Sequence, residues 1–323
     1  MRQLPSTEYL LRRLWAVLAI FALVALGALL YAEDARQALA SASLVSVLSF
    51  MTLIMLSWLV RTAKWRYLSA CLGVRLPWRG AWAVYVGGFP MTLTPARAGE
   101  LWRCWVMCKR WGMNYRRALP LIFCDRLLDL NTLLFFAMAG IFVGWWLTAA
   151  LAALALAPLL LLFLRPRWFA QMVKIIWVLC RRAKPRFFAA LLAMCRHLQT
   201  VTRPGLYLPA LLLALLSWLL EALAIVLIVS GVGGVLSVLW AIVALGTANI
   251  AGVLTLLPGG IGGQEVTLIY LLEDAGNTAG VALAATVVVR LFAVGGATLL
   301  GLPFFIFLSR TTVNGGASRH RAR

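Results

Sequence analysis

Hydrophobic residues form long runs along the chain, and short polar or basic segments separate these runs. A helix needs about 20 mostly apolar residues to cross the hydrocarbon core of a bilayer. Runs of suitable length lie at residues 14–31, 44–60, 118–145, 147–164, 206–229 and 281–308. The pattern predicts an all-α, polytopic integral membrane protein with about six full spans.

Two further apolar runs are interrupted by residues that a membrane-spanning helix disfavours. Residues 81–94 lead into the stretch L-T-P-A-R-A-G-E at 93–100, and residues 236–257 lead into L-L-P-G-G-I-G-G-Q-E at 256–265. Irregular backbone at membrane depth is tolerated only where protein or a water-filled cavity covers it. We therefore expect two re-entrant or broken-helix elements, each of which enters the membrane and turns back.

Composition and charge support the membrane assignment and exclude other classes. Hydrophobic residues make up 63% of the 323 residues and charged residues only 12%, so a sizeable soluble domain is excluded. The net charge of +20 does not indicate nucleic-acid binding, because no soluble fold presents it and membrane orientation accounts for it. By the positive-inside rule we expect every Lys and Arg except Arg36, Arg126 and Arg290 on the cytoplasmic side, with Arg61 and Lys64 directly after the span at 44–60.

The segments around the spans complete a single membrane domain over residues 1–323. We expect 14–31 to be an uncleaved first span, with both termini cytoplasmic and the protein in the bacterial inner membrane. The basic linker at 165–203 has apolar residues at helical spacing. It is either an amphipathic helix at the lipid surface or an ordinary connecting helix packed on the protein. Residues 309–323 form a basic cytoplasmic tail.

The sequence offers no pattern for a metal or a cofactor. Its six cysteines form no C-x-x-C pair, and its only histidines are His197 and His320. We interpret the cysteines as reduced and structural, and we expect neither a metal nor a cofactor.

An internal repeat relates residues 43–146 to residues 206–308. Four matches keep a nearly constant offset of 160 to 165 residues: L-S-W-L at 56–59 and 216–219, Pro95 and Pro258, Glu100 and Glu265, Arg126 and Arg290. The predicted spans of the two halves run in opposite directions. Inverted repeats with broken helices are typical of secondary transporters, which bind substrate near the membrane midplane. The alternative is that duplication only built a stable helical bundle.

Two arginines lie within apolar runs, where each costs about 2.5–3.5 kcal/mol on insertion scales. Arg126 has Asp129 one turn further on, whereas Arg290 has no acid within a turn, so that Glu265 or Glu221 is its candidate partner. The functional interpretation is that the arginines hold a phosphate or carboxylate headgroup through two-point hydrogen bonds. The structural interpretation is an ion pair with Glu100 or Glu265, and both hold if substrate displaces the acid.

The proline and glycine breaks are candidate gates. Missing side chains let backbone amides approach a ligand, and the helix after a break presents its positive N-terminus. The gate residues that we expect are Pro95, Gly99, Pro258, Gly259, Gly260, Gly262 and Gly263. Glu221 lies within a span at the position that matches Arg61 in the first half, and it is either a proton-coupling site or a packed, neutral carboxyl.

Three motifs together resemble the lysylphosphatidylglycerol synthase transmembrane-region family, also called flippase-like domain proteins. They are P-x-R-x-G-E at 95–100, R-x-x-D at 126–129 and P-G-G-x-G-x-x-E at 258–265. The resemblance implies lipid translocation, with a phospholipid, an aminoacylated phospholipid or a hopanoid or polyprenyl-linked lipid as substrate. It also places Arg97 among the site residues, with Arg126, Arg290, Glu100, Glu265 and Asp129.

The function that we predict is movement of a polar-headgroup lipid between leaflets. Arg126 and Arg290 would bind headgroup anions, and the glutamates would pair with them or accept a cationic group. One alternative is a membrane-embedded enzyme with Glu100 or Glu265 as general base, although no histidine, metal cluster or nucleophile motif accompanies them. Another is a non-catalytic partner of a separate lipid-modifying enzyme.

Overall fold

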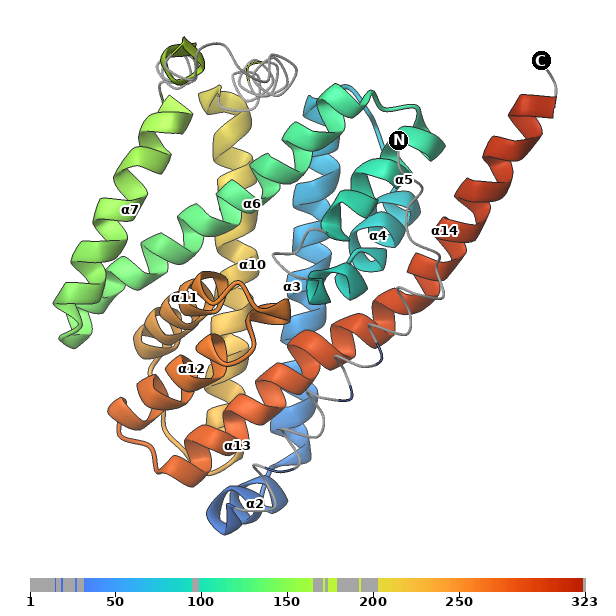
Figure 1. Ribbon diagram of the computed structural model, residues 1–323. Helices are drawn as coiled ribbons and strands as arrows, with labels where there is room; N and C mark the ends of the chain where they lie inside the picture. Colours follow the sequence, from blue (N-terminus) through green and yellow to red (C-terminus); the bar gives the residue numbers. More distant parts are fainter. Residues whose placement is uncertain are drawn as a thin grey trace.

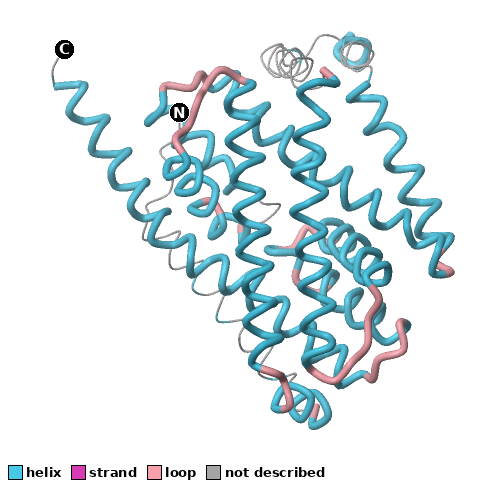
Figure 2. The backbone as a smooth tube through the Cα atoms, turned by 180° about the vertical axis from the view of Figure 1, so that it is seen from behind, coloured by secondary structure: helices cyan, strands magenta, loops and turns pink. Residues whose placement is uncertain are grey.

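The computed structural model describes residues 32–94, 99–164 and 203–321, with a few isolated positions before residue 32 and between residues 165 and 202. This part of the chain is helical, with loops and without strands (Figures 1 and 2). Within it, the segments Leu44–Cys71, Arg117–Val143, Gly205–Gly231 and Ala279–Thr312 are helical, long and apolar enough to cross a membrane. The prediction of an all-α, polytopic membrane protein is confirmed.

Residues 43–146 and residues 206–308 each contain a long helix, two shorter helices and a further long helical segment, and the helix Trp146–Leu164 lies almost entirely outside both ranges. After a short helix α2 (Glu33–Ala40), the first half contains α3 (Leu44–Cys71), α4 (Trp78–Gly87), the 3-10 turn η1 (Phe89–Leu93), α5 (Leu101–Trp111), α6 (Tyr115–Met138), η3 (Ala139–Val143) and α7 (Trp146–Leu164). The second half contains α10 (Pro204–Gly231), α11 (Val238–Leu254), η4 (Pro258–Gly260), α12 (Gly263–Asp274), α13 (Ala279–Arg290), the π-helix η5 (Leu291–Gly296) and α14 (Ala297–Arg321).

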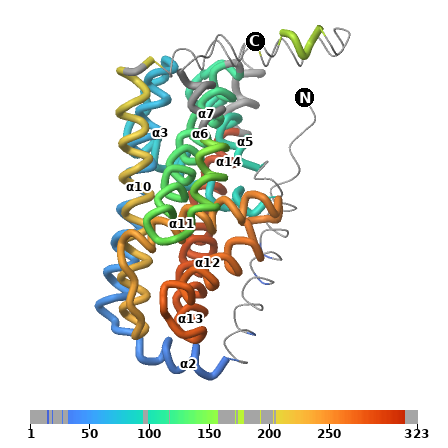
Figure 3. The backbone as a smooth tube through the Cα atoms, turned by 90° about the vertical axis from the view of Figure 1, so that its left-hand side faces the viewer, coloured from blue at the N-terminus to red at the C-terminus, as the bar shows by residue number. Residues whose placement is uncertain are grey.

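Helices α3 and α10 form the axis that joins the halves, and they lie side by side and antiparallel (Figure 3). The amide of Ser43 donates to the carbonyl of Gly231 at one end, and Tyr67 Oη donates to the carbonyl of Leu206 at the other. Each helix has 28 residues, and the tetrapeptide L-S-W-L occupies the middle of both. Gly231 allows close contact, because a Cβ there would lie 2.5 Å from the Cβ of Ser46.

The same turn follows both long helices. Gly73 has φ of 89° and Gly233 has φ of 88°, a left-handed conformation that favours glycine. The next amide in each turn reaches back to a helix carbonyl at 2.9 Å, from Val74 in the first half and from Gly234 in the second. The turns after α3 and α10 therefore share the same geometry.

The predicted break of the second half is present, with the 3-10 turn η4 between α11 and α12; in the first half η1 follows α4, and residues 95–98 before α5 lie outside the described residues. In the second half, Gly259 and Gly260 have φ of 66° and 70°, so the chain turns sharply between α11 and α12. Helix α11 also crosses α6 closely at Gly246, where a Cβ would lie 2.8 Å from the carbonyl oxygen of Leu133. In this break Gly259 and Gly260 are buried, whereas Leu254, Leu256 and Leu257 just before them are exposed.

One predicted boundary is wrong. The span that we expected to end at Val60 continues as α3 to Cys71, so Arg61 and Lys64 lie within the helix and are buried. In the sequence, these two basic residues resemble the cytoplasmic flank of a span. In the fold, Arg61 pairs with Glu221, and Lys64 pairs with Asp125 and Asp129. The predicted first span at 14–31 and the basic linker at 165–203 lie almost entirely outside the described residues.

Candidate functional site

Arg126 in α6 pairs with Glu100, which begins α5. Arg126 Nε donates to Glu100 Oε2 at 2.7 Å, and Arg126 Nη1 lies 3.5 Å from Asp129 Oδ2 one turn further along α6. The Arg126 side chain is 28% exposed, whereas the Glu100 side chain is only 4% exposed. The carboxylate therefore lies behind the guanidinium and holds it towards more open space.

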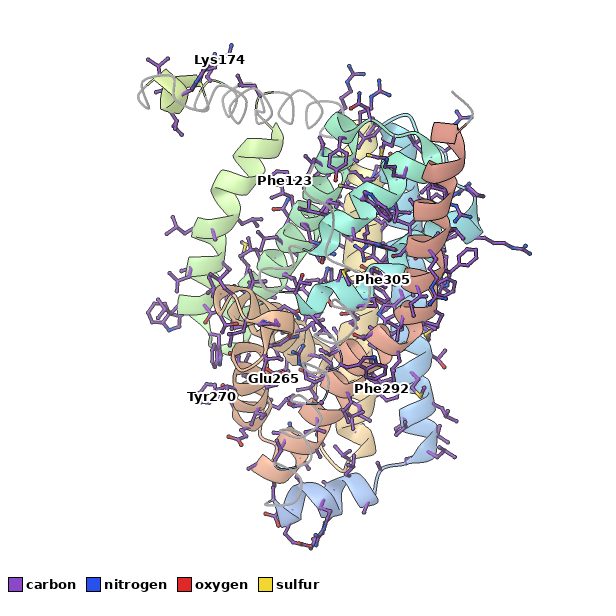
Figure 4. All side chains as sticks on the ribbon, turned by 45° about the vertical axis from the view of Figure 1, so that its right-hand side comes forward. Phe123, Lys174, Glu265, Tyr270, Phe292 and Phe305 are labelled. Atoms are coloured by element: carbon purple, nitrogen blue, oxygen red, sulfur yellow. The ribbon has the colours of Figure 1, made fainter. Side chains whose placement is uncertain are left out.

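Arg290, the last residue of α13, makes the equivalent pair with Glu265 in the first turn of α12. Arg290 Nε donates to Glu265 Oε1 at 2.7 Å, Nη1 to Gln264 Oε1 at 2.7 Å and Nη2 to the carbonyl of Gly259 at 2.8 Å. The second oxygen of Glu265 accepts the amide of Gly262 at 2.8 Å, which caps the start of α12. Figure 4 labels Glu265 on the orange helices, away from the ends of the long helices.

These two pairs agree with the ion pairs expected from the sequence. Of the two acids proposed as partners for Arg290, the structure selects Glu265, and Glu221 pairs elsewhere. Both glutamates lie at helix starts, where unsatisfied amides favour a negative charge.

A buried cluster in the first half was not expected. Lys64 Nζ lies 3.0 Å from Asp125 Oδ1 and also contacts Asp129 Oδ1, and the Lys64 side chain is completely buried. Trp218 of α10 donates its indole N–H to the same Asp129 oxygen at 3.2 Å. One acid, Asp129, thus connects α3, α6 and α10. Asp125 and Asp129 lie four residues apart on one face of α6, and Arg126 alone cannot neutralise both. This excess of acid was a signal in the sequence that a further basic residue lies nearby.

Arg61 and Glu221 form an ion pair at the contact between the two long helices. Arg61 Nη2 donates to Glu221 Oε1 at 2.8 Å, and Ser57 Oγ donates to the same oxygen at 2.8 Å. The Arg61 guanidinium stacks on the Trp218 ring at 3.9 Å, and its Nη1 lies 3.7 Å from Asp129 Oδ1. Among the described ion pairs, this is the one that joins residues 43–146 to residues 206–308.

A cavity of about 150 Å³ lies where these groups meet. Its polar wall includes the guanidiniums of Arg61, Arg126 and Arg290 and the carboxylate of Glu221. Asn249 and Gln264 add amides, and apolar residues complete the wall: Ile54, Trp58, Phe89, Ile225, Leu245, Val289 and Val294. Both halves contribute to the cavity.

The charges around the cavity are arranged for an anion. Three described guanidiniums face it, whereas Glu100 and Glu265 are absent from its wall and hold two of those guanidiniums in place. A guanidinium that is oriented by a carboxylate keeps further N–H groups for a planar, two-point contact with a phosphate or carboxylate. The cavity therefore offers guanidinium hydrogen-bond donors in a wall that is largely apolar.

The remaining predicted residues fall into two groups. Pro95 and Arg97 lie outside the described residues. Gly99 is described, and its amide donates to Thr94 Oγ1 at 2.7 Å. Residues 258–263 form the expected break, and its Gly259 both lines the cavity and accepts from Arg290.

Other buried groups were also missed by the sequence. Arg103 of α5 donates to the carbonyl of Tyr85 at 2.8 Å and lies over the Tyr85 ring at 4.5 Å. Gly88 is required beside it, because a Cβ there would lie 2.0 Å from Arg103 Nε. Within the described residues, no group of three His, Cys, Asp or Glu side chains is placed to hold a metal ion.

Comparison with known proteins agrees with this architecture. The family model described as "Lysylphosphatidylglycerol synthase TM region" matches residues 14–301. A protein described as "UPF0104 membrane protein" from Methanothermobacter thermautotrophicus (strain Delta H) is 24% identical over 324 residues, which cover 90% of this chain and 95% of that protein. The chain is thus a multi-pass membrane protein that belongs to the lysylphosphatidylglycerol synthase transmembrane-region family.

Proposed function

We propose that this protein moves a lipid with an anionic headgroup between the two leaflets of its membrane. The observation that supports this most is the cavity between the halves, whose wall carries three arginines that partner acids orient. Buried charges are expensive in a membrane protein and mark substrate pathways when they face a cavity.

The proposed path follows from the arrangement of the breaks. Helix pairs α4–α5 and α11–α12 turn back within the protein, and their breaks lie against each other where η1 meets η4. A headgroup would cross between the breaks through the polar cavity, while the acyl chains stay in lipid. Movement of one break away from the other would open the cavity to one side at a time.

The matching halves support alternation between two such openings. We interpret the common order of helices, the identical turns at Gly73 and Gly233 and the antiparallel axis helices as an inverted repeat. In transporters of this kind, two halves rock around a central site. The site proposed here lies at the interface of the halves, as that mechanism requires.

Reconstitution into vesicles tests the proposal. The purified protein is inserted into vesicles that contain a fluorescently labelled anionic phospholipid, and a membrane-impermeant quencher reports which leaflet holds the label. We expect the protein to increase exchange of labelled phosphatidylglycerol over protein-free vesicles. Exchange at the protein-free rate for phosphatidylglycerol and for other anionic lipids would refute the proposed function.

Arg290→Lys separates an anion site from a purely structural ion pair. Three guanidinium nitrogens of Arg290 meet three separate acceptors, and lysine keeps the charge but loses the planar fork. We expect lipid exchange to fall at least about tenfold, which corresponds to about 1.4 kcal/mol, while the variant remains folded. Normal exchange by a well-folded Arg290→Lys variant would contradict a two-point headgroup site.

A further inference from the structure

The acid partners of the three cavity arginines differ in where they lie along their helices. Glu100 begins α5, and Glu265 lies in the first turn of α12 with an oxygen on the amide of Gly262. Such carboxylates keep the favourable field of a helix N-terminus when an arginine moves away. Glu221, by contrast, lies in the middle of α10, far from either helix end.

Glu221 also has few other partners. Its two described donors, Ser57 Oγ and Arg61 Nη2, meet the same oxygen, Oε1. Of the described acidic residues, Glu221 alone lines the cavity, and its side chain is 18% exposed. Without Arg61, its remaining hydrogen bond would come from a neutral hydroxyl within an apolar helix.

Arg61, in turn, has a second acid within reach. Its Nη1 lies 3.7 Å from Asp129 Oδ1, and its guanidinium stacks on Trp218. An anion in the cavity can therefore draw Arg61 from Glu221 without leaving the guanidinium uncompensated. The charged groups around this pair are Lys64 on α3, Asp129 and Arg126 on α6 and Arg290 on α13, and Tyr85 on α4 lies on the same cavity wall.

We propose that Glu221 is a proton-binding site, and that it takes up a proton when an anionic headgroup competes for Arg61. When Arg61 turns to the anion, Glu221 loses its described ion-pair partner and keeps the Ser57 hydroxyl as its described donor. Protonation breaks the described ion pair between the halves, so anion binding, proton uptake and release of the halves are coupled. The inference rests on the proposed function for the identity of its anion, a phosphate-bearing headgroup.

Calorimetry measures this coupling directly. Dihexanoylphosphatidylglycerol is titrated into the full-length protein in detergent, in buffers that differ in ionisation enthalpy, so that the number of protons taken up follows from the buffer dependence of the heat. We expect uptake of about one proton per lipid bound, and tighter binding as pH falls, since the protonated state is the bound state. Glycerophosphoglycerol, the headgroup without acyl chains, shows whether a lipid or a free phosphodiester is the ligand.

Three variants make the result specific. Glu221→Gln preserves an acceptor for Ser57 and Arg61 but carries no charge, so we expect binding without proton uptake. Glu273→Gln changes an exposed glutamate outside the cavity and should leave the uptake unchanged. Ser57→Ala removes the other donor to Glu221, so uptake should persist and extend to higher pH.

The outcomes distinguish the two proposals. Lipid binding by the wild type without proton uptake would overturn the proton site and leave translocation intact. Equal uptake by the wild type and Glu221→Gln would also overturn it. Failure of both anions to bind would overturn the proton site together with the proposed anionic substrate.

Discussion

Replacing Lys64 by methionine tests whether the buried cluster of the first half depends on its charges. Methionine keeps an unbranched apolar side chain of similar length and removes the ammonium group. Asp125 then loses its partner at 3.0 Å and keeps only Arg126 Nη2 at 4.0 Å, while Asp129 retains Arg61 and the Trp218 indole. The loss therefore falls mainly on a single carboxylate.

The expected magnitude follows from burial. Neither Lys64 nor Asp125 has more than 1% of its side chain exposed, so water cannot replace the lost partner. Removing one partner of such a pair costs about 3–5 kcal/mol, because it leaves a buried charge uncompensated. Lys109→Met, at an exposed lysine, is the matched control and should change stability by less than about 0.5 kcal/mol.

A second substitution identifies the cause. Asp125→Asn added to Lys64→Met removes the uncompensated charge, so the double variant should be more stable than the sum of the single effects predicts, by about 1–3 kcal/mol. In the second half, the offsets of the repeat place Ala224 and Val289 at the matching positions, which indicates that an apolar pair fits this packing.

Unfolding in mixed micelles provides the measurement. The fraction of folded protein is followed by tryptophan fluorescence and circular dichroism as sodium dodecyl sulfate is added. The wild type, Lys64→Met, Asp125→Asn, the double variant and Lys109→Met are measured under the same conditions. If Lys64→Met is as stable as Lys109→Met, or if the two substitutions at the cluster are simply additive, the ion pair does not stabilise the fold as argued.

Three further predictions follow from the geometry. Gly246→Ala should lower the melting temperature because its Cβ would lie 2.8 Å from the backbone of α6, whereas Gly205→Ala, with open space around it, should not; equal melting temperatures would contradict the close crossing. Glu100→Gln and Glu265→Gln should each block lipid exchange in folded protein and trap opposite openings, and cysteine-accessibility changes of the same direction in both would exclude alternation. Cys71, which is half-buried, should react with an impermeant thiol reagent only from the cytoplasmic side, and labelling from outside would reverse the assigned orientation.

Much of the fold was predictable because the membrane constrains it strongly. Apolar length predicted four spans that the structure describes, and a run of proline and glycine predicted the break of the second half. The pairs of Arg126 with Glu100 and of Arg290 with Glu265 were also predictable, since a charge in an apolar helix requires a partner and few acids are available.

The polar centre was less predictable, for a physical reason. Arg61 and Lys64 follow an apolar run of sufficient length, and local sequence cannot distinguish a cytoplasmic flank from a helix that continues into a polar interior. The acids that stabilise them, Glu221, Asp125 and Asp129, are distant in sequence and meet them only through packing. A further hint was the repeat inferred from the sequence, which places Arg61 and Glu221 at equivalent positions with opposite charges.

The opposite charges of Arg61 and Glu221 also favour the pairing of α3 with α10 over the pairing of either helix with a copy of itself. Two copies of α3 packed in the same antiparallel manner would place guanidinium against guanidinium, and two copies of α10 would place carboxylate against carboxylate. Like charges repel strongly in an apolar interior, so both mispairings are penalised where the mixed pair is favoured. If α3 and α10 arose as copies of one helix, the opposite charges at Arg61 and Glu221 favour the mixed pair over association of like with like during insertion.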